Sequence, residues 1–204
     1  MTANNNQEQE VKFYLGNRSG FEERLQKLGA LLRTPRTFEA NLRFDTPAGS
    51  LTRARQVLRL RQDEKARLTF KGPAEVGHEI SVRPEIEFEV SSFDNARAFL
   101  EALGYLVSVR YDKYRTTYDL GSLEVVVDEL PFGDFAEIEG SSTAEIQSAA
   151  VALGLNWEAR SIDSYLGLFM RLRMAEGLTA QNLTFEEVRQ KYPAGAFGLK
   201  AADS

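Results

Sequence analysis

Charged side chains at alternate positions near the start of the chain are the first candidates for chemistry. Glu8, Glu10 and Lys12 are spaced two residues apart, and Val11 and Phe13 alternate with them. If this stretch is a β-strand, the three charged groups share one face and the apolar groups share the other. Carboxylates beside an ammonium group suit a surface that binds metal ions and anions, or a surface that simply faces water.

The same alternation recurs in most of the other stretches that could form strands. Their basic residues are Lys12, Arg43, Arg59, Arg61, Lys71, Arg83, Lys113 and Arg115. Their acidic residues are Glu8, Glu10, Glu85, Glu87, Asp128, Glu137 and Glu139. Mg²⁺ and similar hard cations prefer carboxylate oxygens together with substrate phosphates, whereas lysine and arginine match phosphate oxygens. A polyphosphate that chelates a divalent metal would satisfy both sets.

These residues must be positioned by a set of strands and helices that the sequence pattern predicts. Strands are expected over residues 7–15, 39–45, 56–62, 67–71, 79–90, 107–118, 123–130 and 135–140. Capping residues and glycine stops predict helices over about 19–28, 96–103, 144–153, 165–174 and 184–192. The first and last of these helices would open with the capping boxes Ser19–Glu22 and Thr184–Glu187. Either Ser161 or Asp163 would cap the fourth.

This pattern predicts an α+β fold with one large antiparallel sheet or barrel. In one interpretation the charged strand faces are exposed to water, as is ordinary for half-buried sheets. In the other, the helices cover the apolar faces from outside, and the charged faces line the interior of a closed barrel. We prefer the barrel, because exposed sheet faces favour Thr, Tyr and β-branched side chains over repeated Glu-x-Glu and Arg-x-Arg. An eight-stranded barrel has room inside for one small ligand.

Length and composition limit the class of protein. The 204 residues suggest one domain with at most an appendage. The chain has no cysteine, no apolar run of about 20 residues and a polar first six residues, so we expect a cytoplasmic protein without a membrane span. The net charge of −5 gives no reason to expect nucleic acid, and any anion site must be a local concentration of lysine and arginine.

The ordered set of charged motifs resembles the CYTH superfamily, the triphosphate tunnel metalloenzymes. The resemblance covers about residues 7–170, and the motifs that carry it are Glu8-x-Glu10-x-Lys12, Arg59-x-Arg61, Lys71-Gly-Pro, Arg83-x-Glu85-x-Glu87, Lys113-x-Arg115, Asp128, Glu137-Ile-Glu139 and Ser164-Tyr165-Leu-Gly-Leu168. It implies a closed tunnel of eight antiparallel strands with a charged interior, surrounded by helices. We therefore expect a tunnel domain over 1–174. Residues 175–204 would be a helical extension, not a separate domain, that packs outside the barrel rather than over a tunnel mouth.

The resemblance also implies a role for individual residues. One metal ion would be bound by Glu8, Glu10 and Glu139. A second metal cluster would comprise Glu87, Asp128 and Glu137. The triphosphate would be clamped by Arg59, Arg61, Lys71, Arg83 and Arg115. Two lysines would act in catalysis: Lys12 by holding a phosphate or orienting the acidic pair, and Lys113 by activating the attacking water. A neighbouring arginine and a dry interior would both favour the neutral amine that Lys113 needs for this role.

The function that follows is a reaction at the triphosphate group of ATP, thiamine triphosphate or inorganic tripolyphosphate, with Mg²⁺ or Mn²⁺ as the cofactor. Hydrolysis by a triphosphatase is the leading reading. The alternative is a class IV adenylyl cyclase that converts ATP to 3′,5′-cyclic AMP and pyrophosphate. A second alternative is a non-catalytic module that binds nucleotide or polyphosphate. We expect neither nucleic acid nor a membrane as a partner, and homodimer formation stays open.

Overall fold

The computed structural model describes residues 7–203, so the polar stretch 1–6 and Ser204 lie outside the described residues. The strands are β1 (Gln7–Leu15), β2 (Leu31–Asp45), β3 (Val57–Gln62), β4 (Ala66–Lys71), β5 (Ser81–Val90), β6 (Leu106–Leu120), β7 (Leu123–Leu130), β8 (Gly133–Glu139) and β9 (Arg160–Ser161). The α-helices are α1 (Arg18–Lys27), α2 (Ser50–Arg53), α3 (Phe93–Ala102), α4 (Thr143–Ala152) and α5 (Tyr165–Glu176). Short 3₁₀ helices are η1 (Trp157–Ala159) and η2 (Ala194–Phe197).

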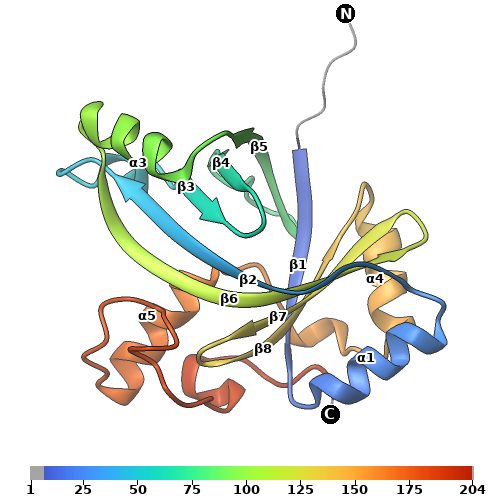
Figure 1. Ribbon diagram of the computed structural model, residues 1–204. Helices are drawn as coiled ribbons and strands as arrows, with labels where there is room; N and C mark the ends of the chain where they lie inside the picture. The colour runs from blue at the N-terminus through green and yellow to red at the C-terminus, as the bar shows by residue number, and fades with distance from the viewer. Residues whose placement is uncertain (1–6, 204) are drawn as a thin grey trace, which may run out of the picture.

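Eight of the strands close into an antiparallel ring, as the alternating charge pattern predicts. The hydrogen-bonded order is β5-β4-β3-β2-β6-β7-β8-β1, and β1 pairs with β5 to close the ring. The closing pair runs from Gln7 opposite Pro84 to Glu10 opposite Ser81. β9 adds a short pairing to β1. Figure 1 shows the long curved strands β2 and β6 crossing the front of this ring.

The apolar strand faces point outward and are covered by helices. Val11, Phe13 and Leu15 of β1 are buried in one core cluster with Phe21 and Leu25 of α1, and with residues of α4. A second cluster joins β7 and β8 to α5 and the C-terminal segment, and a third joins β2 and β3 to α3. In Figure 1, α1 and α4 lie on one side of the barrel, α5 on the other, and α3 beside β3 and β4. This packing leaves the charged faces for the interior and confirms the predicted α+β barrel.

The largest difference from the predicted strands is the length of β2. It begins at Leu31 rather than at residue 39, and it pairs with β6 along most of its length. Pro35 lies where the register between the two strands shifts, between Thr34 and Thr37. Proline removes a backbone donor and is tolerated at such irregular points, so it interrupts the alternation without ending the strand.

Two predicted caps are also wrong by a few residues. The side chain of Asn17, not of Ser19, accepts a hydrogen bond from the backbone N–H of Gly20 and caps α1. Helix α5 is capped by Ser164, whose hydroxyl accepts from the N–H of Gly167, rather than by Ser161 or Asp163. None of the helices within residues 7–203 is both long and apolar enough to cross a membrane.

The helix predicted over residues 184–192 is wrong. Residues 185–187 form a turn, and the only helical element after α5 in the described chain is η2. The carboxylate of Glu187 accepts hydrogen bonds from the backbone N–H groups of Gln181 and Asn182, so it caps the preceding loop instead of a helix start. Leu183, Val188 and Phe197 pack into the core cluster of α5, on the outer side of the barrel.

The end of β2 is held to α2 by one carboxylate. The oxygens of Asp45 accept hydrogen bonds from the backbone N–H groups of Thr46, Leu51 and Thr52 and from the Thr52 hydroxyl. Burial alone would raise the pKa of Asp45, but the hydrogen bonds from Thr52 and Leu51 lower it to about 2. The ionised carboxylate therefore fixes the α2 turn in place.

We expect Asp45→Asn to lower the free energy of unfolding by about 2 kcal/mol at pH 7, because it removes charge-assisted hydrogen bonds. A carboxylate with a lowered folded-state pKa stabilises the protein above its unfolded pKa, and this stabilisation is lost as the pH falls through the folded value. The difference between wild type and variant should therefore persist from pH 7 to 5 and shrink between about pH 4 and 2. Urea unfolding at several pH values measures it. The exposed Asp94, at the start of α3, gives the control Asp94→Asn, which should cost less than about 1 kcal/mol.

Candidate active site

The ring encloses a cavity of about 320 Å³ whose wall is dominated by charged side chains. Every predicted site residue except Asp128 lines it. A neighbouring cavity of about 390 Å³ shares Arg61, Glu87, Arg115 and Glu124 with the first, so the two meet inside the ring. No residue of the described C-terminal segment 175–203 lines either cavity, in agreement with its packing outside the barrel.

One corner of the cavity is acidic. Glu8 and Glu10 come from β1, and Glu139 of β8 stands directly opposite Glu10. Burial and the neighbouring Glu10 raise the pKa of Glu8 to about 8. Glu139 is more exposed, but the protein around its carboxylate and the charges of Glu124 and Glu10 raise its pKa to about 7. Burial first, and the neighbouring carboxylates second, therefore disfavour negative charge on Glu8 and Glu139, and a cation would stabilise it.

Lys12 bridges this acidic corner to Glu137. Its ammonium group donates a hydrogen bond to Glu10 and lies 3.2 Å from Glu137 Oε1. Burial alone would lower the pKa of Lys12, but the carboxylates of Glu10 and Glu137 raise it above its ordinary value. Burial would likewise raise the pKa of Glu10, and the charge of Lys12 lowers it to about 2. The lysine is therefore a fixed positive charge beside the acidic pair.

The fully buried carboxylate of Asp128 organises the floor of the site. It accepts hydrogen bonds from Lys113 Nζ at 3.0 Å, from Arg115 Nε at 2.7 Å and from the hydroxyl of Tyr165 at 2.9 Å. Arg115 also donates to Glu137 at 2.6 Å. Asp128 thus holds two cavity-lining cations and the first residue of α5 in one network.

Lys113 lies between two carboxylates rather than beside arginine alone. Its ammonium group is 3.0 Å from Asp128 and 3.5 Å from Glu39, and its side chain is buried. Burial alone would raise the pKa of Glu39, but the charges of Lys113 and Arg115 lower it to about 2. Asp128 and Glu39 therefore hold the Lys113 side chain inside the site.

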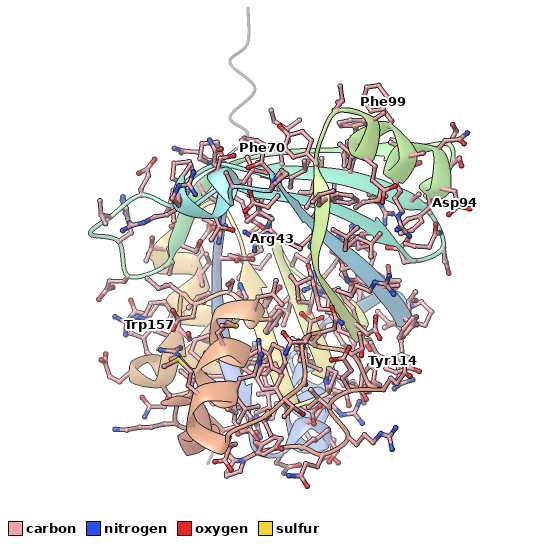
Figure 2. The ribbon with its side chains drawn as sticks, turned by 90° about the vertical axis from the view of Figure 1, so that its left-hand side faces the viewer. Arg43, Phe70, Asp94, Phe99, Tyr114 and Trp157 are labelled. Carbon is pink, nitrogen blue, oxygen red and sulfur yellow. The ribbon has the colours of Figure 1, made fainter. Side chains whose placement is uncertain are left out.

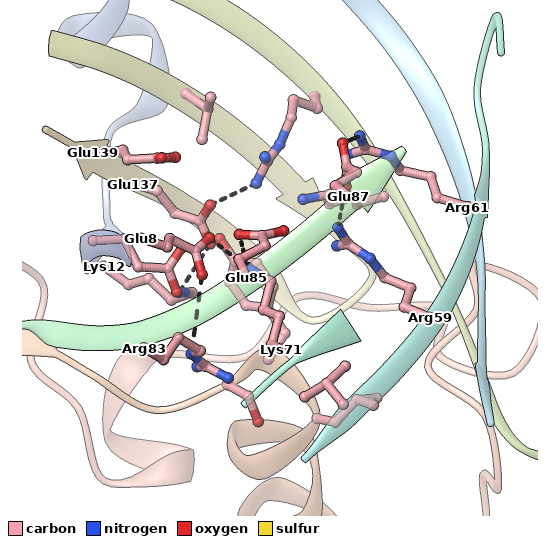
Figure 3. Close-up of a pocket in the computed structure, with 18 of the residues that line it drawn as sticks. Glu8, Lys12, Arg59, Arg61, Lys71, Arg83, Glu85, Glu87, Glu137 and Glu139 are labelled. Carbon is pink, nitrogen blue, oxygen red and sulfur yellow. Dashed lines mark hydrogen bonds and ion pairs between the residues drawn. The ribbon is translucent and has the colours of Figure 1, made fainter. Parts of the chain in front are cut away.

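The opposite wall carries the arginine residues of β3. Both arginines form ion pairs with Glu87 of β5. Arg59 Nη2 lies 3.2 Å from Glu87 Oε2, and Arg61 Nη2 lies 3.1 Å from Glu87 Oε1. Glu87 also accepts a hydrogen bond from Thr69 at 2.7 Å. Figure 3 shows these arginines with Glu87 on one side of the cavity, and Glu8, Glu137 and Glu139 on the other. The predicted second metal cluster is therefore divided, with Glu87 apart from Glu137.

Lys71 and Arg83 stand between the two walls. Lys71 donates a hydrogen bond to Glu8 and lies 3.2 Å from Glu85, and Arg83 Nε is 4.0 Å from Glu8. These contacts keep the cations next to the acidic corner, where a ligand with both a metal and phosphates would meet them. The predicted triphosphate clamp is thus brought into one cavity.

The acidic corner fits a hard divalent cation in its donor chemistry, since all of its acidic side chains offer carboxylate oxygen. One of these atoms, Glu8 Oε2, is buried and has no hydrogen-bond partner. Within residues 7–203, however, no three acidic or histidine side chains converge as a metal centre. The carboxylates of Glu8 and Glu10 are paired with Lys71 and Lys12, so metal binding would require these ion pairs to rearrange.

Several cavity residues were not among the predicted site residues. Glu39 contacts Arg61 and Lys113, Tyr111 contacts Arg59 through its hydroxyl, and Arg43 lines the cavity on the same strand as Glu39. The alternation Glu39-x-Asn41-x-Arg43 was a usable signal, because it places all three on the inward face. Tyr111 gave no such signal, since a tyrosine suits either face of a strand.

The chain is similar to known proteins in sequence and in structure. The family model described as the CYTH domain matches residues 6–160. A proposed adenylate cyclase from Vibrio parahaemolyticus superposes with a TM-score of 0.72 at 23% identity, over 80% of this chain and 97% of that chain. A protein from Pyrococcus horikoshii superposes with a TM-score of 0.66 at 25% identity, over 78% and 97% of the respective chains. No curated protein matches the chain in sequence.

A further similar structure is a proposed adenylyl cyclase from Hippeastrum, described as having a dominant triphosphatase activity. It has a TM-score of 0.58 and 20% identity, over 80% of this chain and 95% of that chain. These structural matches share the fold, and the family model covers most of the region in which the charged motifs lie. The chain therefore belongs to the CYTH domain family.

Proposed function

We propose that the protein is a divalent-metal-dependent triphosphatase that hydrolyses a phosphoanhydride bond of an organic or inorganic triphosphate. The observation that carries this proposal is the cavity of about 320 Å³ with an acidic corner on one side and arginine side chains on the other. A metal–triphosphate complex has the matching distribution of charge, since the metal meets the carboxylates and the phosphates meet the bases.

Substrate binding would exchange the present ion pairs for contacts with phosphate. Lys71 would leave Glu8, and Arg59 and Arg61 would loosen from Glu87, as their donors turn to phosphate oxygens. The freed carboxylates would then be available to a metal ion. When bound, the metal would neutralise developing charge on the phosphates and orient the attacking water.

Fixed positive charges inside the ring would supply the rest of the catalysis. Lys12 and Arg115 are held by buried carboxylates, so they need no reorganisation when negative charge develops on the phosphate oxygens. Lys113, held by Asp128 and Glu39, would contribute in the same way. This role differs from the activation of the attacking water that the family resemblance implies for Lys113.

Hydrolysis is preferred over cyclisation because the cavity offers little to recognise a nucleobase. Among the described lining residues, the aromatic side chains are Tyr111 and Tyr165, and their hydroxyls are engaged by Arg59 and Asp128. The cavity is built to bind phosphates, whatever group they carry. The similar structure from Hippeastrum, with its stated triphosphatase activity, adds weight to this choice.

Incubation of the purified protein with tripolyphosphate, thiamine triphosphate or ATP, each with Mg²⁺ or Mn²⁺, tests the proposal. We expect phosphate release from at least one substrate, and loss of that release when EDTA removes the metal. Restoring the metal should restore activity. Cyclic AMP and pyrophosphate from ATP would instead identify a cyclase. Binding without turnover of any of the three would identify a non-catalytic module and overturn the proposal.

A further inference from the structure

Arg43 occupies an unusual position on the inner wall of the barrel. It lies on β2 directly opposite Arg59 of β3, and both side chains line the cavity. Side chains directly opposite each other in an antiparallel pair have their Cβ atoms about 4.5–5.5 Å apart, so like charges there destabilise the sheet. Figure 2 labels Arg43 in the middle of the view, among the strands.

Arg43 has no close carboxylate partner among the described residues. Each of the other basic residues that line this cavity has a carboxylate oxygen within 4.0 Å. Within residues 7–203, Arg43 has no such partner, and its one hydrogen bond goes from a terminal guanidinium nitrogen to the backbone carbonyl of Gln56 at 3.0 Å. Burial lowers the pKa of Arg43, and the charges of Arg83 and Arg59 lower it further, whereas Tyr111 and Asp45 act to raise it.

A second observation on the same strand points to a missing polar ligand. Asn41, the next inward residue of β2, is 1% exposed, yet neither its amide oxygen nor its amide nitrogen has a hydrogen-bond partner. Its neighbours across the sheet are Arg61 of β3 and Tyr111 of β6. On Arg59 as well, the buried Nε has no hydrogen-bond partner. Unpaired polar groups of this kind are rare in folded proteins and cost free energy unless a ligand satisfies them.

We propose that Arg43 and Arg59 form a subsite for the terminal, unesterified phosphate of the substrate, next to the unpaired amide of Asn41. The proposal rests on the proposed function and names the end of the triphosphate that this wall binds. A terminal phosphate carries more charge and more free oxygens than an internal one, so it matches a pair of arginine forks with spare donors. The substrate class is then a chain phosphate with a free end, such as tripolyphosphate or a nucleoside triphosphate.

Binding measured by calorimetry without added divalent metal tests this subsite independently of turnover. The variant is Arg43→Gln, and the probes are linear tripolyphosphate and cyclic trimetaphosphate, which has no terminal phosphate. We expect Arg43→Gln to raise the Kd for tripolyphosphate at least about tenfold. The Kd for trimetaphosphate should change less than about threefold, because its phosphates are all internal. Arg43→Lys keeps the positive charge but not the forked guanidinium group, so its Kd for tripolyphosphate should lie between those of wild type and Arg43→Gln.

The matched control is Arg110→Gln, which removes an exposed arginine from the outside of the same wall, opposite Leu42. It should leave both Kd values unchanged. Thermal unfolding without ligand should show that Arg43→Gln is as stable as wild type or more stable, because the variant removes like-charge repulsion from Arg59. A lower Tm would instead assign a structural role to Arg43.

The two proposals fail in different ways. An unchanged Kd for tripolyphosphate in Arg43→Gln, or equal weakening for tripolyphosphate and trimetaphosphate, would overturn the terminal-phosphate subsite even if the protein is a triphosphatase. Selective weakening in a protein that hydrolyses none of the triphosphates would support the subsite and refute the proposed function. Failure of the wild type to bind tripolyphosphate would overturn the subsite directly.

Discussion

A Glu10→Gln variant is expected to hydrolyse its triphosphate at least about a hundred times more slowly than wild type, a loss of roughly 2.7 kcal/mol of transition-state stabilisation. Glu10 is buried in the acidic corner, where it is opposite Glu139 and beside Glu8. Glutamine keeps the size of the side chain but not its charge, so the corner loses much of its attraction for a divalent cation. The variant Glu137→Gln should behave similarly, since Glu137 joins Lys12 to Arg115.

The measurement is steady-state phosphate release as a function of Mg²⁺ or Mn²⁺ concentration. A raised metal requirement in Glu10→Gln would show that the lost carboxylate acts through the metal. Glu89→Gln is the matched control, because Glu89 lies on the same strand as Glu87 but is exposed and pairs only with Lys65 among the described residues. It should keep wild-type rates. Wild-type rates in Glu10→Gln at every metal concentration would refute the assignment of Glu10 as a metal ligand.

Asp128→Ala is expected to lower the free energy of unfolding of the metal-free protein by about 3–5 kcal/mol, which is the cost of leaving buried charges without their partner. Asp128 is fully buried and accepts from Lys113, Arg115 and Tyr165. Its removal would leave Lys113 with Glu39 alone as a carboxylate partner among the described residues. The Tm should fall by roughly 10 °C for a chain of this length.

This experiment also tests the predicted role of Asp128 as a metal ligand. Glu87→Gln removes another residue predicted for the same metal cluster, but Glu87 is partly exposed and pairs with Arg59 and Arg61. We expect Glu87→Gln to cost less than about 1 kcal/mol. If Asp128→Ala keeps the wild-type Tm without metal and loses only the stabilisation that added metal gives, Asp128 is a ligand rather than the anchor of the lysine and arginine.

The barrel could be predicted from the sequence because the charge pattern and the helices gave consistent information. Charged residues at alternate positions of Glu8-x-Glu10-x-Lys12 and Arg59-x-Arg61 identified one face, and Val11 and Phe13 identified the other. Amphipathic helices then required an outer apolar surface to cover. The alternation of charged and apolar residues depends only on residues that are close in the sequence, so it can be recognised without knowledge of the tertiary structure.

The rest depended on contacts between distant residues. The first part of β2 was not predicted, because Pro35 interrupts the alternating pattern. Only the pairing with β6 shows that the strand continues through a register shift there. The Thr184–Glu187 capping box is only half formed: the Glu187 N–H donates to the Thr184 hydroxyl, but the Glu187 carboxylate accepts from the backbone of Gln181 and Asn182 instead. The separation of Glu87 from Glu137 is likewise set by where β5 and β8 lie in the ring, and no spacing in the sequence encodes it.

The seam that closes the ring has a consequence for how the protein reaches its native state. β1 is the first strand of the chain, yet its partners β5, β8 and β9 are all made later. Contacts between segments far apart in the chain form slowly, because the entropy of loop closure must be overcome first. Glu10 and Glu139 face each other only in the pairing of β1 with β8. During synthesis on the ribosome, β1 must therefore wait for β8 to emerge, and the acidic corner is assembled only after that pairing forms.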